Sequence, residues 1–329
     1  MPPSDGSLAH LFRSRVLVLD GATGTELERR GVPTPRPLWS AAALLTHPDL
    51  VAAIHRDYVA AGADILVANT FRTNARALRA AGLFHRGQEL NRRAVALARQ
   101  ASSAASRPTP GTGTDGHRQE ATAEPRSPTD ATRPCGRPVL VAASLAPVED
   151  CYSPQLAPQE ALLLDEHRQM LGWLTAANPD LVWIETMNTV REARAAARVT
   201  TEAQMPFVVS FVVREDGNLL SGERLEEAVA AVEPLAPLAI GLNCIPPAGL
   251  TALLPRLRRA TGRPLVAYAH INNPAPITGW SYSQMVGPEE YAEHVRRWLD
   301  LGASVVGGCC GTTPAHIRAI RDALDRQAH

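Results

Sequence analysis

Eight strand-like apolar runs alternate with eight amphipathic stretches along this chain of 329 residues, and the alternation constrains its fold more than any other feature. The strand-like runs are Val16–Asp20, Asp64–Asn69, Pro138–Leu145, Leu181–Glu185, Phe207–Val213, Leu238–Cys244, Pro264–His270 and Ser304–Cys309. The helical stretches are Pro48–Ala61, Gln88–Ala101, Gln159–Ala177, Val190–Ala203, Glu223–Leu235, Leu250–Ala260, Pro288–Leu301 and Pro314–Leu324. Eight βα units predict an α/β fold and favour a closed (β/α)8 barrel of the TIM type over an open doubly wound sheet, although periodicity alone does not prove closure.

One segment interrupts this alternation. From Ser102 to Arg137 the chain is rich in Pro, Gly, Thr, Ser, Asp and Arg and has almost no large apolar residue. Such a segment cannot bury enough surface to offset the entropy lost on ordering, so we predict a disordered insertion at 102–137. Because the alternation continues on both sides, residues 1–329 are expected to form one domain, with the insertion as a spacer that has no catalytic role.

The charge balance points to small-molecule partners. The formal net charge is zero, from 33 basic and 33 acidic residues, so no global basic field indicates a nucleic acid or a membrane, and the oligomeric state stays open. All 33 basic residues are Arg, and the chain contains no Lys. Schiff-base aldolases and pyridoxal-phosphate enzymes need a lysine amine, so the composition excludes both classes.

The sequence gives no sign of export. Met1 to Leu11 lack the charged start and apolar core of a signal peptide. No apolar run reaches the roughly 18 residues of a membrane helix. Five cysteines in 329 residues do not resemble a secreted disulfide framework. A cytoplasmic location is therefore the simplest expectation.

Polar groups follow six of the eight predicted strands directly. They are Asp20-Gly21, Asn69-Thr70, Glu185-Thr186, Asn243-Cys244, His270 and Cys309-Cys310. In a βα barrel the functional groups gather at the carboxyl ends of the strands. We therefore expect these side chains on one rim of the barrel, where Cys244 and Cys309 come from nearby strands.

The cysteines on this rim suggest a metal site. Cys309 and Cys310 are neighbours within Gly307–Gly311, and their Cα separation of about 3.8 Å is shorter than the roughly 4.4–6.8 Å of a disulfide. Neighbouring strand residues point to opposite faces, but the flanking glycines allow the backbone to leave the strand and turn both sulfurs inward. With Cys244 they would hold zinc and leave one of its four positions open. The alternative, that they are small core residues, stays open.

A three-thiolate site favours sulfur chemistry. With three thiolates the zinc complex carries a charge of about −1, so the metal suits holding another thiol as a thiolate better than activating water. His270 is the nearest candidate for a fourth protein ligand, with a packing or substrate-facing role as its alternative. Other possible functions are a zinc-assisted hydrolase or lyase, and a non-enzymatic thiol- or zinc-binding module that needs a separate corrinoid or folate partner.

Five motifs, spread over almost the whole chain, carry a family resemblance. They are Leu19-Asp20-Gly21-Ala22-Thr23-Gly24-Thr25-Glu26-Leu27, Ala68-Asn69-Thr70-Phe71, Glu185-Thr186, Gly241-Leu242-Asn243-Cys244 and Gly307-Gly308-Cys309-Cys310-Gly311-Thr312-Thr313-Pro314. With these motifs the chain resembles the homocysteine S-methyltransferase family, which includes S-methylmethionine- and betaine-dependent enzymes and the homocysteine domain of cobalamin-dependent methionine synthase. The pair formed by the last two motifs is highly specific, whereas the first alone could pass for a Gly-rich phosphate loop.

The resemblance implies a zinc-dependent enzyme of methionine biosynthesis. Cys244, Cys309 and Cys310 match the Zn2+ ligands of the family, and homocysteine would take the open position as a thiolate. That thiolate would attack an activated methyl group in line and give methionine, with no catalytic residue beyond the zinc site. S-methylmethionine or S-adenosylmethionine is the expected donor.

The resemblance also implies a substrate pocket. Asp20 and Glu185 match acidic groups that face the substrate ammonium. The backbone around Gly21 and the Thr70 position match the part of the pocket that meets the carboxylate. Asn243 is expected to support the loop that carries Cys244. Capping of a following helix is the alternative for Asp20 and Thr70.

Two loops on the mouth depart from the S-methylmethionine-type pattern, so the sequence does not fix the donor. A Gly-Pro-Tyr-Gly-like turn is replaced at 144–152, and a Pro-Asn-Ser/Ala-Gly-like run is replaced at 270–274. Cys151 is expected to be a spectator, and Cys135 falls in the predicted insertion. By position alone, the donor side could include Glu149, Asp150, Tyr152, His270 and Trp280.

Overall fold

The structure is a computed structural model that describes residues 5–105, 138–271 and 286–327. Cys135, Trp280 and residues 106–137 of the predicted insertion lie outside these ranges. The predicted start of the insertion at Ser102 is wrong, because helix α6 (Gly87–Ala105) continues to Ala105. Ala98, Ala101 and Ser102 are buried, so the apolar face of the helix extends past its predicted end.

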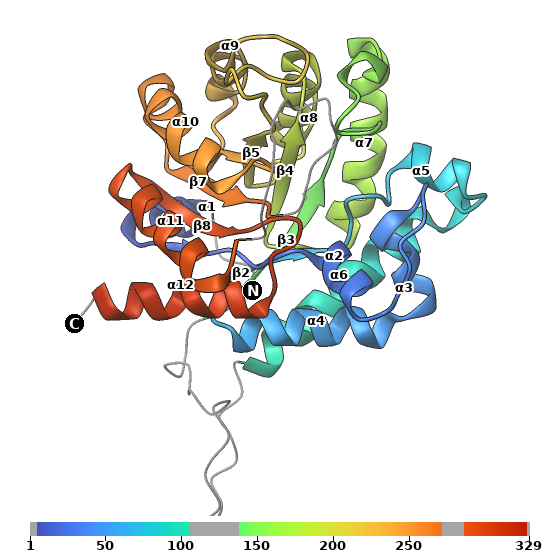
Figure 1. Ribbon diagram of the computed structural model, residues 1–329. Helices are drawn as coiled ribbons and strands as arrows, with labels where there is room; N and C mark the ends of the chain where they lie inside the picture. The colour runs from blue at the N-terminus through green and yellow to red at the C-terminus, as the bar shows by residue number, and fades with distance from the viewer. Residues whose placement is uncertain (1–4, 106–137, 272–285, 328–329) are drawn as a thin grey trace, which may run out of the picture.

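Eight parallel strands form the centre of the molecule (Figure 1). The strands are β1 (Leu17–Val18), β2 (Ile65–Ala68), β3 (Leu140–Leu145), β4 (Leu181–Met187), β5 (Phe207–Phe211), β6 (Ala239–Asn243), β7 (Leu265–Ala269) and β8 (Ala303–Gly308). Their order is β1-β8-β7-β6-β5-β4-β3-β2. A bridge between Leu19 and Ile65 joins the first strand to the second, with a 2.9 Å hydrogen bond from Asp20 N to Ile65 O. The predicted (β/α)8 barrel is confirmed.

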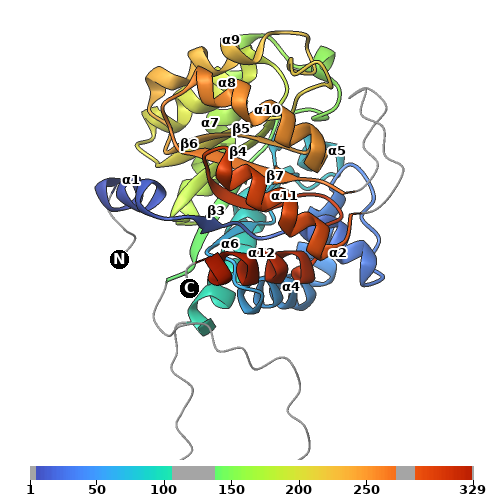
Figure 2. The same cartoon turned by 60° about the vertical axis from the view of Figure 1, so that its left-hand side comes forward.

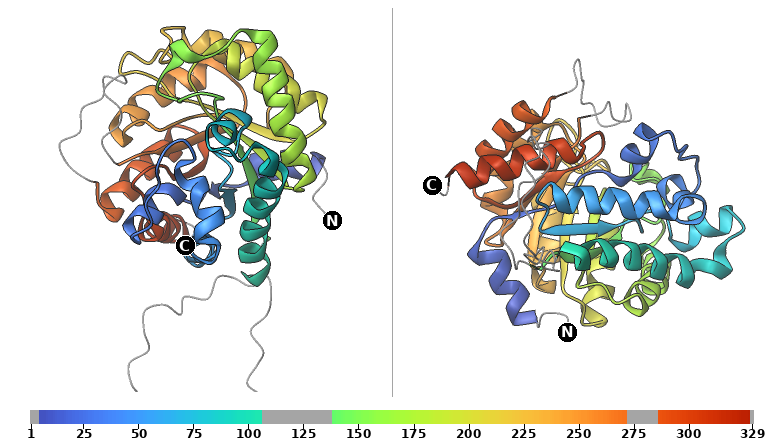
Figure 3. Two further views of the ribbon diagram at one scale, coloured as in Figure 1. Left: turned by 90° about the vertical axis from the view of Figure 1, so that its right-hand side faces the viewer. Right: turned by 90° about the horizontal axis from the view of Figure 1, so that it is seen from below.

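Helices surround the strands (Figure 2). The α-helices are α1 (Asp5–Ser14), α2 (Thr23–Arg29), α3 (Ala43–Thr46), α4 (Pro48–Ala60), α5 (Ala75–Ala80), α6 (Gly87–Ala105), α7 (Glu160–Ala176), α8 (Val190–Glu202), α9 (Leu225–Val232), α10 (Pro247–Ala260), α11 (Pro288–Asp300) and α12 (Pro314–Gln327). Short 3-10 turns lie at Trp39–Ala42, Phe84–Arg86, Pro154–Leu156 and Glu233–Leu235. Neighbouring helices pack side by side, as α4 and α6 do (Figure 3).

All eight predicted strands and helical stretches are present, and the differences lie at their ends. β1 covers only Leu17–Val18 of the run predicted from Val16 to Asp20, because Asp20 leaves the strand to enter the mouth of the barrel. β4 runs two residues beyond its predicted end at Glu185, to Met187. The short elements α1, α2, α3 and α5 were not predicted.

Local chemistry explains where many helices begin. Four helices start with proline, which has no amide hydrogen to leave unpaired in the first turn: α4, α10, α11 and α12. Two others start behind a side chain that accepts a backbone hydrogen bond. Asn74 accepts from Ala77 N at 2.9 Å before α5, and Thr189 accepts from Glu192 N at 3.2 Å before α8.

The barrel interior is apolar at the amino ends of its strands. The inward side chains there form one buried cluster: Leu17, Leu19, Ile65, Leu140, Ala142, Leu181, Trp183, Val208, Ala239, Val266 and Val305. Leu8 and Phe12 of α1 belong to the same cluster and are fully buried. The α1 helix therefore closes this end of the barrel.

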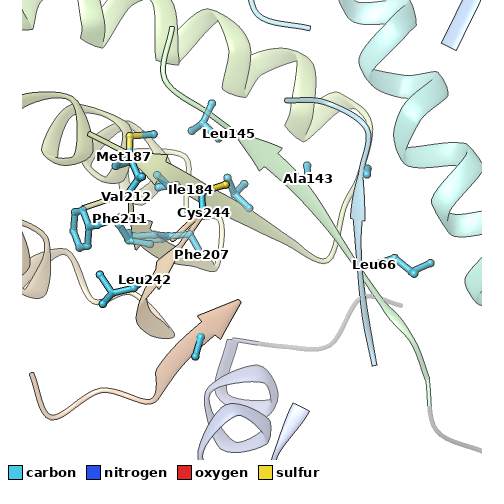
Figure 4. Close-up of a cluster of buried hydrophobic side chains, with 14 of the residues drawn as sticks. Leu66, Ala143, Leu145, Ile184, Met187, Phe207, Phe211, Val212, Leu242 and Cys244 are labelled. Atoms are coloured by element: carbon cyan, nitrogen blue, oxygen red, sulfur yellow. The ribbon is translucent and has the colours of Figure 1, made fainter. Parts of the chain in front are cut away.

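A second and larger core lies between the strands and the helices. It takes the alternate residues of each strand, because successive strand side chains point to opposite faces. Figure 4 shows part of it, with Ile184, Met187 and Leu242 near Cys244. Because both faces of every strand are buried, the strands read as continuous apolar runs in the sequence.

None of the helices in the described ranges is both long and apolar enough to cross a membrane.

Candidate active site

Three cysteine thiols meet at the carboxyl ends of β6 and β8. Cys244 follows β6, and Cys309 and Cys310 follow β8. Their three Sγ atoms all lie within 4.8 Å of one another, and the Cys244 and Cys309 sulfurs are 2.7 Å apart. None of the three forms a disulfide. Within the described ranges, this is the one group of three or more His, Cys, Asp or Glu side chains close enough to hold a metal ion.

Backbone geometry brings both neighbouring cysteines to the same place. Cys309 N still donates to Ala269 O of β7 at 2.9 Å, so this residue keeps the strand pairing. A side chain at Gly308 would lie 2.2 Å from the Thr312 hydroxyl, which shows how tightly the chain folds back. Gly311 has φ of 86°, which completes the turn after Cys310. The glycines thus serve close approach as well as the predicted departure from the strand.

The donor set fits a tetrahedral metal. Zinc–sulfur bonds of about 2.3 Å place two thiolates about 3.8 Å apart, so the sulfurs lie in the right range after the closest pair separates by about 1 Å. Hydrogen bonds from the Cys244 and Cys309 thiols hold the pKa of Cys310 well below its ordinary value. One thiolate is therefore favoured in the trio, and a cation would favour the other two.

The thiols open into a cavity of about 360 Å³ at the mouth of the barrel. This volume is in the range of small-molecule sites, about 300–1,000 Å³. Among the side chains that line the cavity, the charged or titratable ones are Asp20, Arg36, Arg72, Asp150, Cys151, Tyr152, Glu185, Cys244, Tyr268, Cys309 and Cys310. The cavity therefore combines the thiol trio with carboxylates and two guanidinium groups.

Two buried carboxylates face this cavity. Asp20 Oδ2 accepts from Val67 N at 2.9 Å, and Glu185 accepts from the Ser144 and Tyr268 hydroxyls at 2.6 and 3.1 Å. Burial raises the pKa of Asp20 well above its ordinary value, and it raises the pKa of Glu185 to about 7. Each carboxylate therefore gains from a cation placed beside it.

A chain of hydrogen bonds runs behind Glu185 through the barrel interior. The Tyr268 hydroxyl accepts from Trp183 Nε1 at 3.0 Å and lies 2.7 Å from Ser210 Oγ, which bonds Asn243 Oδ1 at 2.7 Å. These side chains are buried, so the network fixes the orientation of the Glu185 carboxylate.

Asn243 joins the ends of β4 and β6. Its amide bonds Thr186 twice, accepting from the backbone N–H at 3.0 Å and donating to Oγ1 at 2.8 Å. Thr186 and Cys244 have φ of 59° and 54°, a backbone region that costs β-branched and other non-glycine residues energy. Asn243 thus stabilises the strained turns beside Glu185 and Cys244, and it does not itself line the cavity.

Gly21 lines the cavity, whereas Thr70 is fully buried behind it. A side chain at Gly21 would lie 2.8 Å from the Tyr58 ring and hydroxyl. The Thr70 hydroxyl donates to Ser144 O at 2.8 Å, which links β2 to β3. Neither Asp20 nor Thr70 caps a helix, because Ala22 precedes α2 and Asn74 caps α5.

Of the four described candidates for the donor side, two line the cavity and two do not. Asp150 and Tyr152 line the cavity, while the Glu149 carboxylate pairs with Arg76. His270 is buried, and burial lowers its pKa to about 4. Cys151 lines the cavity without joining the thiol trio, and burial raises its pKa to about 12.

Sequence reasoning gave no role in the site to several residues that line the cavity, among them Arg36, Trp39, Phe71, Arg72 and Tyr268. The Trp39 and Phe71 rings meet edge to face, with their centroids 5.8 Å apart. Phe71 and Arg72 directly follow the Asn69-Thr70 pair on the rim, so their position could have indicated them. Arg36 and Trp39 lie in the connection between α2 and α3, where no periodic pattern points to the mouth.

Comparison with known proteins agrees with this geometry. A family model of homocysteine S-methyltransferase matches residues 17–324. The selenocysteine Se-methyltransferase of Brassica oleracea var. italica is 31% identical over 327 residues, covering 93% of this chain and 88% of the relative. Homocysteine S-methyltransferase 2 of Arabidopsis thaliana is 30% identical over 323 residues, covering 93% of this chain and 92% of the relative.

A solved structure is similar over almost its whole length. The homocysteine methyltransferase MmuM from Escherichia coli, in its metallated form, superposes with a TM-score of 0.77 at 29% sequence identity, covering 95% of this chain and 98% of that one. These matches show that the chain belongs to the homocysteine S-methyltransferase family and is an enzyme of that class.

Proposed function

We propose that the protein transfers a methyl group from a small sulfonium donor, S-methylmethionine or S-adenosylmethionine, to the thiolate of L-homocysteine in a zinc-dependent reaction that gives methionine. The observation that carries the proposal is the convergence of three thiols and two buried carboxylates on one cavity. Family membership accounts for methyl transfer to homocysteine. The metal, the donor and the residue roles are the proposal.

Cys244, Cys309 and Cys310 would hold the metal. Three protein thiolates complete three of four tetrahedral positions, which leaves one position for the substrate sulfur. A bound zinc ion supplies a lowered thiol pKa, so that the substrate sulfur is a thiolate at neutral pH. The strained φ of Cys244 fits a position held for ligation rather than for packing.

Asp20 and Glu185 bind the ammonium group of homocysteine in this proposal. Burial raises the pKa of both carboxylates, and an ammonium between them would favour their charged forms. The backbone at Gly21 faces the same cavity and is available to the substrate carboxylate. Thr70 and Asn243 act from behind, through their bonds to Ser144 O and to Thr186.

The outer cavity suits a cationic donor. The rings of Trp39, Phe71 and Tyr152 line it, and aromatic faces attract sulfonium as they attract other cations. The homocysteine sulfur forms a new bond to the methyl carbon while the bond from that carbon to the donor sulfur breaks. The electron pair of the broken bond stays on the donor sulfur, which becomes a neutral thioether, and the thiol proton has already left to solvent.

The alternative of a hydrolase or lyase is less well supported. That chemistry needs a general base beside an activated water, whereas Asp20 and Glu185 already accept hydrogen bonds from fixed neighbours. The family relatives named above are methyltransferases, which also favours methyl transfer over a non-enzymatic binding module.

A methionine-formation assay tests the proposal. Purified zinc-loaded protein is incubated with homocysteine and, in parallel, with S-methylmethionine, S-adenosylmethionine, betaine or a methylfolate, and metal content is measured on the same sample. We expect about one zinc per chain and methionine from a sulfonium donor. Stoichiometric zinc without methionine from any donor would overturn the proposal.

A further inference from the structure

Two guanidinium groups and one carboxylate lie together at the outer part of the cavity. Arg36 Nη1 is 2.5 Å from Asp150 Oδ2, and Arg72 Nη2 is 4.0 Å from Asp150 Oδ1. The side chains of Arg72 and Asp150 are 15% and 18% exposed, whereas that of Arg36 is 75% exposed. Arg72 and Asp150 are thus partly withdrawn from water, and Arg36 marks the rim.

The loop between β3 and α7 holds Asp150 in place. Asp150 Oδ1 accepts from Tyr152 N at 3.0 Å, and Arg72 Nη1 donates to Glu149 O at 3.0 Å. Burial alone would raise the pKa of Asp150. The Tyr152 N–H and the Arg36 guanidinium nevertheless hold that pKa below its ordinary value. The Asp150 carboxylate is therefore charged at neutral pH, and its hydrogen bond to Tyr152 N holds it in position.

The two ends of the cavity differ in charge. The deep end has Asp20 and Glu185, and the arginines that line the described cavity, Arg36 and Arg72, are both at the outer end. A ligand carboxylate would therefore find a guanidinium partner at the outer end, where Asp150 also offers a charged partner to an ammonium on the same ligand. The aromatic rings of Trp39 and Phe71 line the same cavity.

We propose that Arg72, Arg36 and Asp150 form the subsite for the α-amino-acid end of the methyl donor, with the arginines on its carboxylate and Asp150 on its ammonium. This inference rests on the proposed function and narrows it. The donor is a sulfonium α-amino acid, and sulfonium or quaternary ammonium acids that lack an α-amino group are poor donors. The sulfonium lies toward Trp39 and Phe71, between this subsite and the thiol trio.

Steady-state kinetics with two donors test the subsite. For the wild-type enzyme, we expect kcat/KM for S-methylmethionine to exceed that for 3-(dimethylsulfonio)propanoate, which has no α-amino group, by at least about tenfold. In Asp150→Asn and Arg72→Gln, kcat/KM for S-methylmethionine should fall about 10- to 100-fold, because each loses a hydrogen bond to a charged group. The KM for homocysteine should stay within about twofold, since its proposed partners are at the deep end.

Glu149→Gln is the matched control. Glu149 is on the same loop and pairs with Arg76, but it does not line the cavity, so its kinetics should match those of the wild type. Circular dichroism and zinc content of each variant show whether it is folded and metal-loaded. A loss in Asp150→Asn that Glu149→Gln does not share supports the subsite.

Several results would overturn the inference without touching the proposed function. One is equal use of both donors by the wild-type enzyme. Another is an unchanged kcat/KM for S-methylmethionine in Asp150→Asn and Arg72→Gln. A third is a rise in the KM for homocysteine in place of a donor effect, which would assign these residues to the acceptor. Absence of methionine from every donor with the wild-type enzyme would instead reject the proposed function.

Discussion

The two ends of this barrel use the same strands for opposite purposes. At the amino ends the inward side chains are apolar, and Leu8 and Phe12 of α1 cover them. At the carboxyl ends the corresponding layer contains the polar or sulfur-bearing side chains of Ser144, Glu185, Ser210, Asn243, Tyr268 and Cys309. One end therefore supplies folding free energy, whereas the other holds buried polar groups that cost free energy unless they are partnered.

The largest effect that separates the two ends should come from the thiol trio. Cys309→Ser removes one of three thiolates, so we expect zinc affinity to fall by more than about 100-fold, and methionine formation to fall with it. Changing only a hydrogen-bond partner of a metal ligand costs less, about 10- to 100-fold. Metal analysis after dialysis against a weak chelator measures the affinity. Cys151→Ser is the control, because Cys151 lines the cavity outside the trio and should leave zinc binding unchanged. Unchanged zinc affinity in Cys309→Ser would contradict the proposal of a three-thiolate site.

The closed end is tested by Phe12→Ala. This fully buried ring fills the apolar end of the barrel, so its loss should cost about 3–5 kcal/mol of unfolding free energy. Denaturant unfolding measures the cost. At a temperature where the variant is folded, kcat/KM should stay within about twofold of the wild-type value, because the cavity residues are untouched. A large loss of kcat/KM with little loss of stability would contradict the division between the two ends.

Away from the mouth of the barrel, a buried histidine without hydrogen-bond partners should make the stability of the protein depend on pH. His55 on α4 is fully buried, neither ring nitrogen has a hydrogen-bond partner, and burial lowers its pKa from 6.5 to about 4. As pH falls, the unfolded chain takes up this proton first, so stability is full above about pH 6.5 and is lost towards pH 4. Between pH 7 and pH 5 the loss from His55 should be about 2 kcal/mol.

His55→Leu tests this contribution. The variant should lose less unfolding free energy between pH 7 and pH 5 than the wild-type protein does, by that same amount. Denaturant titrations at both pH values give the change in unfolding free energy for each protein. The contributions of other buried histidines cancel in the comparison, because both proteins contain them. Parallel pH dependence in the two proteins would show that His55 titrates normally in the folded state.

The smallest effect concerns the network behind Glu185. Tyr268→Phe removes the hydroxyl that donates to Glu185, so the KM for homocysteine should rise about fivefold to tenfold while kcat changes less. Tyr291→Phe is a matched control, because the Tyr291 hydroxyl bonds backbone atoms of Ala269 and Gly307 and does not contact Glu185. It should lower stability and leave the KM unchanged. Equal KM effects in both variants would indicate general loosening in place of positioning.

The sequence predicted the architecture well because its signals are local. Each strand of this barrel is buried on both faces and therefore reads as an apolar run, and the run from Leu181 to Glu185 is an example. The ends of the strands and helices were predicted less accurately, since β4 continues to Met187 and α6 to Ala105. The helix α1 was missed because its role depends on Phe12 reaching strands that are distant in sequence.

The location of the candidate site could be predicted from the sequence, but the direction of its side chains could not. The rule that functional groups follow parallel strands was enough to bring Asp20, Glu185 and the three cysteines to one rim, where the structure places them. It could not distinguish Gly21, which lines the cavity, from Thr70, which lies behind it. That distinction depends on side-chain direction at strand ends, and the positive φ of Thr186 and Cys244 changes the direction there.

The eight βα units, the polar rim and the identity of the three thiols could be predicted from the amino-acid sequence, because they follow from periodicity and from residue type. That Arg36, Trp39 and Arg72 share a cavity with those thiols became known only from the folded chain. These residues come from loops without periodicity, and a loop is placed by its contacts with distant parts of the chain, such as the ion pair between Arg36 and Asp150.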